Sequence, residues 1–356
     1  MANKPDDDAT HYPRRTFVRG AARLASLLIA STLTRTTVAG KEKFPNRGPL
    51  ILAGNHVGLI EPLLMIAYAP YNIEFLAAGD IPIDPRFSWL ANLYGVIPIN
   101  RGNIDTRALR SAVEVLKQGG VLGIFPEGGI WDPFGMKARS GLAWLSYAGN
   151  APILPVGFGG MVGAFEKVIT LKRPRLTMRA GDLIPPLHPE RKDLTRRQAF
   201  EREAAKVMDA IMALLPEEDR ILASGDQPVV ILTVTFSDMP PASAGLDDHL
   251  SPEERRSLGV LLSNAVLMDV LQRNLRLPVT PLRRLGQWQP ASSVGAAANS
   301  VLNYLDGTNP GLLTYRFGME EGQAMKNALI HLAIMGRAAG EMGFRVRLDL
   351  QTPSQP

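Results

Sequence analysis

The sequence contains no cysteine, and only five of its 356 residues are histidine. Without cysteine the chain can form no disulfide, no thiolate metal site and no thiol nucleophile, and this composition is compatible with the cytosol. No close pair of histidines has the spacing of zinc ligands, so we expect no metal site. The histidines are His11, His56, His188, His249 and His331.

The sequence also lacks a long apolar run. The uncharged stretch at residues 24–34 spans 11 residues, whereas a helix that crosses a bilayer needs about 20. No other stretch reaches that length. Basic residues surround this short stretch, and a basic helix with one apolar side is typical of a segment that lies in the membrane interface. The basic residues are Arg14, Arg15, Arg19, Arg23 and Arg35.

We therefore predict a disordered tail at residues 1–13, followed by a membrane-interfacial amphipathic helix at residues 14–35. Two other interpretations of this helix remain open. It could pack on its own domain. It could also be an export signal, because residues 13–19 (Pro-Arg-Arg-Thr-Phe-Val-Arg) resemble a twin-arginine motif. Against an export signal, Arg23 interrupts the apolar region and no clear cleavage site follows.

Charge is distributed unevenly along the chain, whose net charge is +5. Residues 1–220 carry 28 Lys and Arg against 22 Asp and Glu, whereas residues 221–356 carry 11 against 12. A basic first part suits an anionic membrane surface, a nucleic acid or an anionic substrate. The sequence contains no zinc finger or basic zipper, so we expect no nucleic-acid partner.

Predicted strands and helices alternate through residues 36–220, and this order is typical of an α/β fold with a mostly parallel sheet flanked by helices. Polar motifs follow several of these strands, and ligands gather at the carboxyl ends of strands in such sheets. The motifs are therefore expected to share one cleft. The predicted strands are 49–53, 73–77, 95–99, 121–125, 153–156 and 176–180, and the predicted helices are 61–69, 106–118, 137–148 and 194–215.

Residues 221–356 are predicted to form a small C-terminal α+β domain. The composition changes near residue 237, where residues 237–245 (Ser-Asp-Met-Pro-Pro-Ala-Ser-Ala-Gly) are typical of a linker or long loop. The sequence offers no motif or repeat that would give this domain a role. Its predicted strands are 229–236, 311–317 and 343–350, and its predicted helices are 252–274 and 320–340.

The strongest candidate for catalysis is His56, which follows the first predicted strand of the α/β domain and precedes a helix. Glu61 lies five residues later and could fold back towards the imidazole from the first turns of that helix. A carboxylate at one ring nitrogen fixes the tautomer and stabilises the imidazolium, so that the other nitrogen can act as a general base.

Two further motifs lie at the ends of other predicted strands, and a third motif forms a strand. Residues 97–102 (Ile-Pro-Ile-Asn-Arg-Gly) include Arg101, whose guanidinium suits a phosphate. Residues 125–129 (Phe-Pro-Glu-Gly-Gly) include Glu127, and the glycines after it allow close approach of the backbone to a substrate. Residues 151–156 (Ala-Pro-Ile-Leu-Pro-Val) form a predicted strand.

These four motifs, in this order, resemble those of the glycerolipid acyltransferase family, whose members include 1-acylglycerol-3-phosphate (lysophosphatidic acid) acyltransferases. The resemblance covers residues 36–215 and implies a catalytic pair. In it His56 is the catalytic base, and Glu61 replaces the aspartate that the family usually has.

The resemblance also implies a substrate-binding set. Arg101 would contact the phosphate of the acceptor, and Glu127 would help to bind the acceptor. Where many members continue with Thr-Arg, this chain has Gly-Ile at residues 129–130, a loss for which Lys137 could compensate. The implied substrate-binding residues are Asn55, Arg101, Glu127, Gly128, Gly129 and Lys137.

The function implied by the resemblance is that of a membrane-associated O-acyltransferase in phospholipid biosynthesis, peripheral on the cytoplasmic face of the membrane. Acyl-CoA or an acyl carrier protein would donate a fatty acyl group to a lysophospholipid or related glycerolipid hydroxyl, without a cofactor. Two alternatives remain. One is a lipid or thioester hydrolase, although no Gly-x-Ser-x-Gly motif is present. The other is a non-catalytic lipid-binding protein that retains the fold.

Overall fold

A computed structural model describes most of the chain and divides it into two compact units, with the main boundary between residues 226 and 227. Helix α8 (Glu217–Ser224) spans the boundary predicted at residue 220 and belongs to the amino-terminal unit. The described residues are 11–78, 85–99, 105–128, 137–190, 193–224, 229–237, 250–264, 267–268, 271–272, 279–308 and 310–352.

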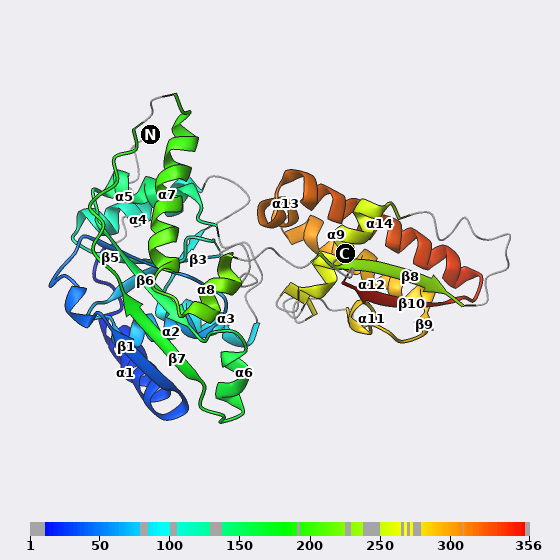
Figure 1. The fold of residues 1–356 in the computed structure, drawn as a ribbon, viewed down its shortest axis with the longest axis horizontal. Helices are drawn as coiled ribbons and strands as arrows, with labels where there is room; N and C mark the ends of the chain where they lie inside the picture. Colours follow the sequence, from blue (N-terminus) through cyan, green and yellow to red (C-terminus); the bar gives the residue numbers. More distant parts are fainter. Residues whose placement is uncertain are drawn as a thin grey trace, which may run out of the picture. The chain divides into compact units, whose positions relative to one another are not determined.

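The amino-terminal unit, drawn in Figure 1, is built on a sheet in the order β1-β7-β6-β2-β5-β3-β4. Every neighbouring pair is parallel except β6 and β7, which are antiparallel. The mostly parallel α/β fold predicted from the sequence is therefore confirmed. The strands are β1 (Arg35–Ala39), β2 (Leu50–Gly54), β3 (Ile73–Ala78), β4 (Ile97–Ile99), β5 (Val121–Ile124), β6 (Ile153–Gly159) and β7 (Arg175–Ala180).

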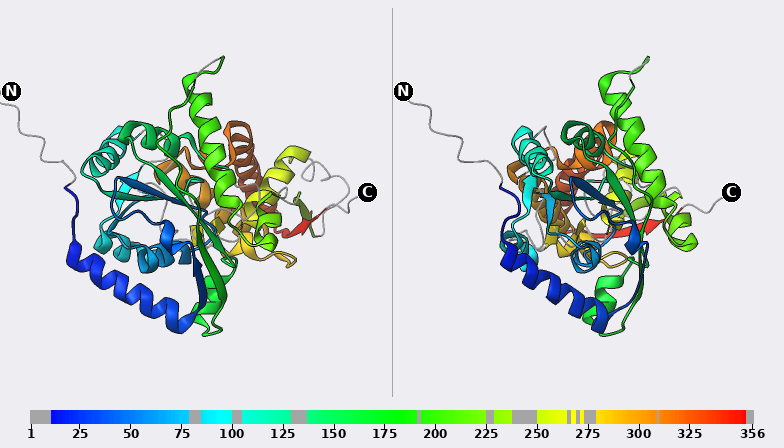
Figure 2. Two further views of the ribbon diagram at one scale, coloured as in Figure 1. Left: turned by 60° about the vertical axis from the view of Figure 1, so that its left-hand side comes forward. Right: turned by 90° about the vertical axis from the view of Figure 1, so that its left-hand side faces the viewer.

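Helices cover both faces of this sheet (Figure 2). In the central strand β2, Ile51 and Ala53 face the core shared with α4, α5 and α7, whereas Leu50 and Leu52 face the core shared with α1 and α2. All five residues of β2 are buried, as expected for a strand covered on both faces. The other helices are α1 (Thr16–Leu33), α2 (Ile60–Tyr68), α3 (Pro85–Tyr94), α4 (Thr106–Lys117), α5 (Ser140–Gly149), α6 (Ala164–Ile169) and α7 (Arg196–Met212).

Helix α1 packs against α2 along the outside of the amino-terminal unit (Figures 1 and 2). Arg19 is only 2% exposed and forms a bidentate ion pair with Glu74 of β3. Arg14 binds the same carboxylate at 2.8 Å. The helix is therefore attached to its own domain, as one of the three interpretations of this segment predicted.

The outward side of α1 is nevertheless apolar. Phe17, Leu24 and Leu28 are 88%, 71% and 62% exposed. These residues recur at helical spacing and therefore lie on one side of the helix, which faces outwards. The charged residues Arg14 and Arg19, in contrast, contact the protein. Among the helices that the structure describes, none is long and apolar enough to cross a membrane.

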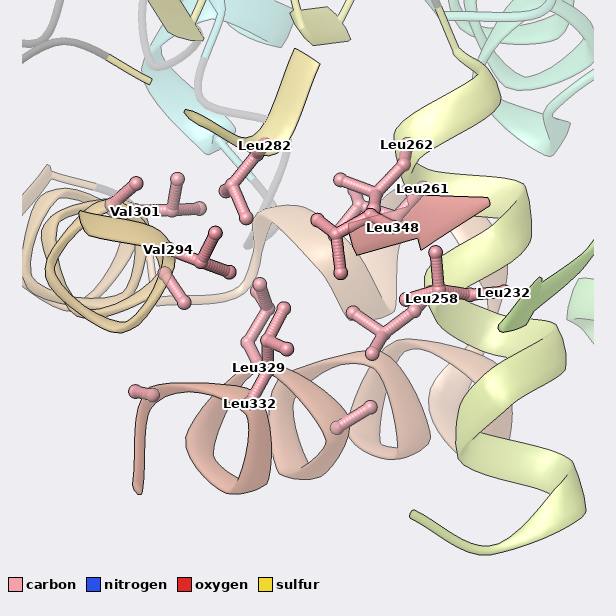
Figure 3. Close-up of a cluster of buried hydrophobic side chains, with 14 of the residues drawn as sticks. Leu232, Leu258, Leu261, Leu262, Leu282, Val294, Val301, Leu329, Leu332 and Leu348 are labelled. Carbon is pink, nitrogen blue, oxygen red and sulfur yellow. The ribbon is translucent and has the colours of Figure 1, made fainter. Parts of the chain in front are cut away.

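The carboxy-terminal unit combines a small antiparallel sheet, in the order β8-β10-β9, with helices. This confirms the predicted α+β class. Its leucine-rich core, shown in Figure 3, joins side chains of β8 and β10 to those of α9, α12 and α14. The strands are β8 (Ile231–Phe236), β9 (Gln289–Pro290) and β10 (Arg345–Gln351), and the helices are α9 (Pro252–Ser263), α11 (Thr280–Arg283), α12 (Ala291–Thr308), α13 (Leu312–Phe317) and α14 (Met319–Glu341).

One prediction for this unit was wrong, and one long helix was missed. Residues 311–317, predicted as a strand, form α13, because Leu312 and Leu313 are both buried against the helical core rather than on alternate faces of a sheet. Helix α12 was not predicted at all. Its Gly295 lies so close to α14 that an added Cβ would come within 2.8 Å of the backbone nitrogen of Arg337, so a residue that normally weakens a helix is needed for packing.

Candidate active site

The fold brings two sequence motifs together because β2 and β5 are parallel neighbours, with Ala53 of β2 opposite Ile124 of β5. The carboxyl ends of the two strands therefore lie side by side. The segment after β2 carries His56, and the turn after β5 carries Glu127. These side chains are 71 positions apart in the chain, yet the His56 backbone N–H donates to Glu127 Oε1 at 3.0 Å.

Asn55 fixes the start of the His56 segment. Its side-chain nitrogen donates to the carbonyl oxygen of Phe158 at 2.9 Å, and its side-chain oxygen accepts from the backbone N–H of Phe158 at 2.8 Å. Asn55 is 1% exposed. Both ends of the amide are thus engaged with β6, so Asn55 holds β2 and β6 together at the site.

Glu61 lies in the first turn of α2 and folds back onto the preceding loop. Its Oε1 accepts from the backbone N–H groups of Val57 and Gly58, at 2.9 and 2.8 Å. Its Oε2 lies 3.6 Å from His56 Nδ1, and among the described residues neither of these two buried atoms has a hydrogen-bond partner. Because catalytic hydrogen bonds are often long before substrate binds, a small closure would complete this one. Nδ1 would then carry the proton, and Nε2 would be left as the base.

The aromatic ring of Phe125 supports the imidazole. The rings of Phe125 and His56 are stacked, with centroids 4.0 Å apart and an interplanar angle of 20°. Phe125 in turn stacks on Phe75 of β3, with centroids 6.3 Å apart. The imidazole is only 12% exposed, so its orientation is restricted by a ring on one side and a carboxylate on another.

Glu127 is a buried carboxyl group, 3% exposed, in the turn after β5. The pKa of Glu127 is raised to about 8, chiefly by burial and to a smaller extent by the charge of Glu61, while hydrogen bonds from the backbone N–H groups of Glu127 and His56 oppose the rise. The turn closes with Gly128 donating to the carbonyl of Phe125 at 3.0 Å. Gly128 has φ +78°, a conformation that favours glycine.

The remaining predicted site residues are exposed to solvent or lie outside the described part of the chain. Arg101 and Gly129 lie outside it, so the structure does not locate them. Lys137 is described and is exposed to solvent. Thus His56, Glu61 and Glu127 are brought together with Asn55 and Gly128 beside them, whereas the phosphate-binding part of the predicted site is undefined.

Two residues that the sequence analysis did not assign to the site are important in the structure. Phe125 lies within the same motif as Glu127. Its position as an aromatic residue directly after a buried strand could have indicated that it belongs to the site. The sequence could not indicate Phe158, because Phe158 binds the Asn55 side chain through its backbone atoms. A small hollow of about 10 Å³ adjoins the loop, lined by Asn55, Val57, Phe158, Met161, Val162, Leu215 and Asp219.

Residues 35–159 match the model of the Acyltransferase family. These residues include β1 to β6, His56, Glu61 and Glu127. The amino-terminal unit therefore contains a segment that matches the Acyltransferase family.

Among particular proteins, the chain is similar to 1-acyl-sn-glycerol-3-phosphate acyltransferase of Bacillus subtilis, with 23% identity over 47% of this chain and 80% of that protein. It is also similar to the protein of the same name from Borreliella burgdorferi, with 32% identity over 26% of this chain and 37% of the relative. Lyso-ornithine lipid O-acyltransferase of Pseudomonas aeruginosa is 36% identical over 23% of this chain and 31% of its own length.

The chain also aligns with the crystal structure of the 1-acyl-sn-glycerophosphate (LPA) acyltransferase PlsC from Thermotoga maritima. The alignment has a TM-score of 0.41 and 18% identity, and it covers 56% of this chain and 80% of that one.

Proposed function

We propose that this protein is a membrane-associated O-acyltransferase of phospholipid biosynthesis. It moves a fatty acyl group from the thioester of acyl-CoA or an acyl carrier protein to a hydroxyl of a lysophospholipid or related glycerolipid. The observation that carries this proposal is the buried Glu61 carboxylate, which faces His56 Nδ1 at 3.6 Å. The acyl substrate is supported by the match to the Acyltransferase family, and the class of acceptor by the names of the similar proteins.

The proposed chemistry needs only the His56–Glu61 pair. His56 Nε2 accepts the proton of the acceptor hydroxyl while the hydroxyl oxygen attacks the thioester carbonyl carbon. Glu61 stabilises the imidazolium that forms. The tetrahedral intermediate then collapses, the carbon–sulfur bond breaks, and the imidazolium returns the proton to the leaving thiolate.

A lipid surface is the proposed partner of helix α1, with the enzyme peripheral on the cytoplasmic face of the membrane. The apolar side of the helix carries Phe17, Leu24 and Leu28 and is exposed. Amphipathic helices bind the interface by burying such a face, and anionic lipids attract a basic protein. An acyl acceptor that is itself a membrane lipid would then be close to the site.

The test is transfer of a radiolabelled acyl group from acyl-CoA, and separately from acyl carrier protein, into a panel of lysolipids, glycerol 3-phosphate and glycolipids. We expect one acceptor class to be labelled, and His56→Ala to reduce the rate about 100-fold or more, because a general base contributes at least that much. His188→Ala is the matched control, because His188 packs edge-on to Tyr147 and has no part in the proposed chemistry.

Two outcomes would overturn the proposal. Release of free fatty acid without any esterified product would make the protein a hydrolase. Vesicle binding that is equal in the wild type and His56→Ala, without turnover from either donor, would favour a non-catalytic lipid-binding protein.

A further inference from the structure

Two buried carboxyl groups hold the backbone of the loop that carries His56. Glu127 accepts from the N–H of His56, and Glu61 accepts from those of Val57 and Gly58. Three consecutive amide groups are therefore bonded by side chains of two different elements. A buried amide without a partner is costly, so the conformation of this loop depends on both side chains.

We propose that Glu127 is a positioning residue, which fixes the His56 backbone and does not bind the acyl acceptor. The inference rests on the proposed function, because it assigns Glu127 a role in that reaction through His56. It differs from what the family resemblance implies for Glu127. Its side chain is 3% exposed and Oε1 is bonded to His56, so the carboxyl group is engaged with the loop and is not open to solvent.

The turn that carries Glu127 controls the imidazole as well as the backbone. Phe125, two residues earlier, stacks on the His56 ring at a centroid distance of 4.0 Å. Gly128 closes the turn by donating to the carbonyl of Phe125. One short turn after β5 therefore sets both the position of the His56 backbone and the plane of its ring.

The charge of Glu127 is not required for this role. Its pKa of about 8 means that the carboxyl group is mostly neutral at pH 7. A neutral carboxyl and a glutamine amide have similar shape, and each presents one carbonyl oxygen that can accept from the His56 N–H. Glutamine should therefore replace Glu127 in the positioning role, whereas alanine should not.

The kinetic test compares Glu127→Gln and Glu127→Ala at pH 7, with kcat and the KM for the acceptor measured separately. We expect Glu127→Gln to keep most of the wild-type kcat and Glu127→Ala to lose about 100-fold, the effect of misplacing a catalytic group by about 1 Å. The KM for the acceptor should stay the same in both. A raised acceptor KM in Glu127→Gln, with kcat unchanged, would overturn the proposal.

Hydrogen–deuterium exchange of the backbone supplies a readout that does not depend on turnover. The amide of His56 should be protected in the wild type and in Glu127→Gln, and should exchange faster in Glu127→Ala. The amides of Val57 and Gly58, which are bonded to Glu61, are internal controls for the loop, and those of β5 and β6 report whether the variant is folded.

If Glu127→Ala does not fold, the glutamine variant decides the question, because loss of His56 protection there would contradict the proposal. If the wild type transfers no acyl group, the proposed function fails while the exchange measurement still tests whether Glu127 holds the loop. The two failures are therefore distinguishable.

Discussion

Glu61 has two tasks, and its length suits both of them. One carboxylate oxygen binds two backbone N–H groups of the loop, and the other faces His56 Nδ1. The resemblance to glycerolipid acyltransferases leads one to expect aspartate at this position. The additional methylene of glutamate provides the reach from the first turn of α2 to the loop and the imidazole together.

Shortening Glu61 should therefore impair catalysis even though the charge is kept. We expect Glu61→Asp to lower kcat about 10- to 100-fold, because one of the two sets of contacts must be given up. Glu61→Gln should lower it by up to about 10⁴-fold, because an amide cannot stabilise the imidazolium and favours the wrong tautomer. Steady-state kinetics measures both, with Glu166→Gln as an exposed control on α6. Full activity in Glu61→Gln would contradict the assigned role.

Glu127 should make stability depend on pH. Its pKa rises from 4.5 to about 8 on folding, so the folded state binds the proton more tightly than the unfolded state. The stabilisation is fully present below about pH 4.5 and is lost as the pH rises towards 8, by about 1.4 kcal/mol for each unit of pKa difference. Glu61 and His56 are the titratable groups nearest to it.

The measurement is the free energy of unfolding of the wild type and of Glu127→Gln between pH 5 and pH 9. Glutamine does not titrate, so the difference between the two proteins isolates Glu127. We expect the wild type to lose stability relative to the variant from pH 5 to pH 8 and to change little above that. Parallel curves over the whole range would show that the pKa of Glu127 is not raised.

At the residue scale, the sequence predicted which side chains meet but not how each is used. His56, Glu61 and Glu127 follow strands whose carboxyl ends are adjacent, and that much follows from chain order in a parallel sheet. The sequence could not show that Asn55 and Glu127 bind backbone groups, because backbone partners have no signature in residue type. Arg101 and Gly129 lie outside the described residues, so their roles stay predictions.

At the scale of elements, the strands of the α/β domain were predictable because buried apolar runs are short and are bounded by glycine, proline or polar residues. Helices with the usual amphipathic pattern, such as α4 and α7, were predicted for the same reason. Elements stabilised mainly by tertiary contacts were not. β1 is short and partly exposed, and α12 carries Gly295 for close packing against α14.

The residues that attach helix α1 to the protein differ from those proposed to dock on the membrane, so the two roles can be tested independently. Leu24→Asp with Leu28→Asp should weaken flotation with anionic vesicles at least about 10-fold, because two apolar side chains each worth roughly 1.5 kcal/mol or more on burial are lost. The free energy of unfolding should change little, because both side chains are largely exposed. Ile334→Asp on α14, where the side chain is 60% exposed, is the control. Unchanged flotation would remove α1 from the membrane proposal.

At the scale of the whole molecule, positive charge is concentrated in the part that contains the site. Residues 1–220 have six more basic than acidic residues, while residues 221–356 are nearly neutral. The carboxy-terminal unit has its own apolar core, and its fold class followed from the sequence although its role did not. The match to the Acyltransferase family ends at residue 159.

This charge distribution predicts that vesicle binding depends on salt. We expect binding to anionic vesicles to weaken as NaCl rises from about 50 to 500 mM, because the Debye length falls below about 10 Å at such concentrations. Binding that remains at high salt would come from the apolar side of α1. Flotation of the wild type and the Leu24 and Leu28 variant over this range measures both contributions. Binding that does not change with salt would exclude an electrostatic contribution.

The ion pairs of Arg14 and Arg19 with Glu74 also bear on how the chain folds while it is being synthesised. Both arginines leave the ribosome about 60 residues before the carboxylate that they neutralise, so the cations are already available when β3 enters the sheet. A chain translated without its first 33 residues would bury Glu74 as an isolated charge, at a cost of several kcal/mol. The amino-terminal helix would then be a condition for the yield of folded protein, whatever lipid it meets afterwards.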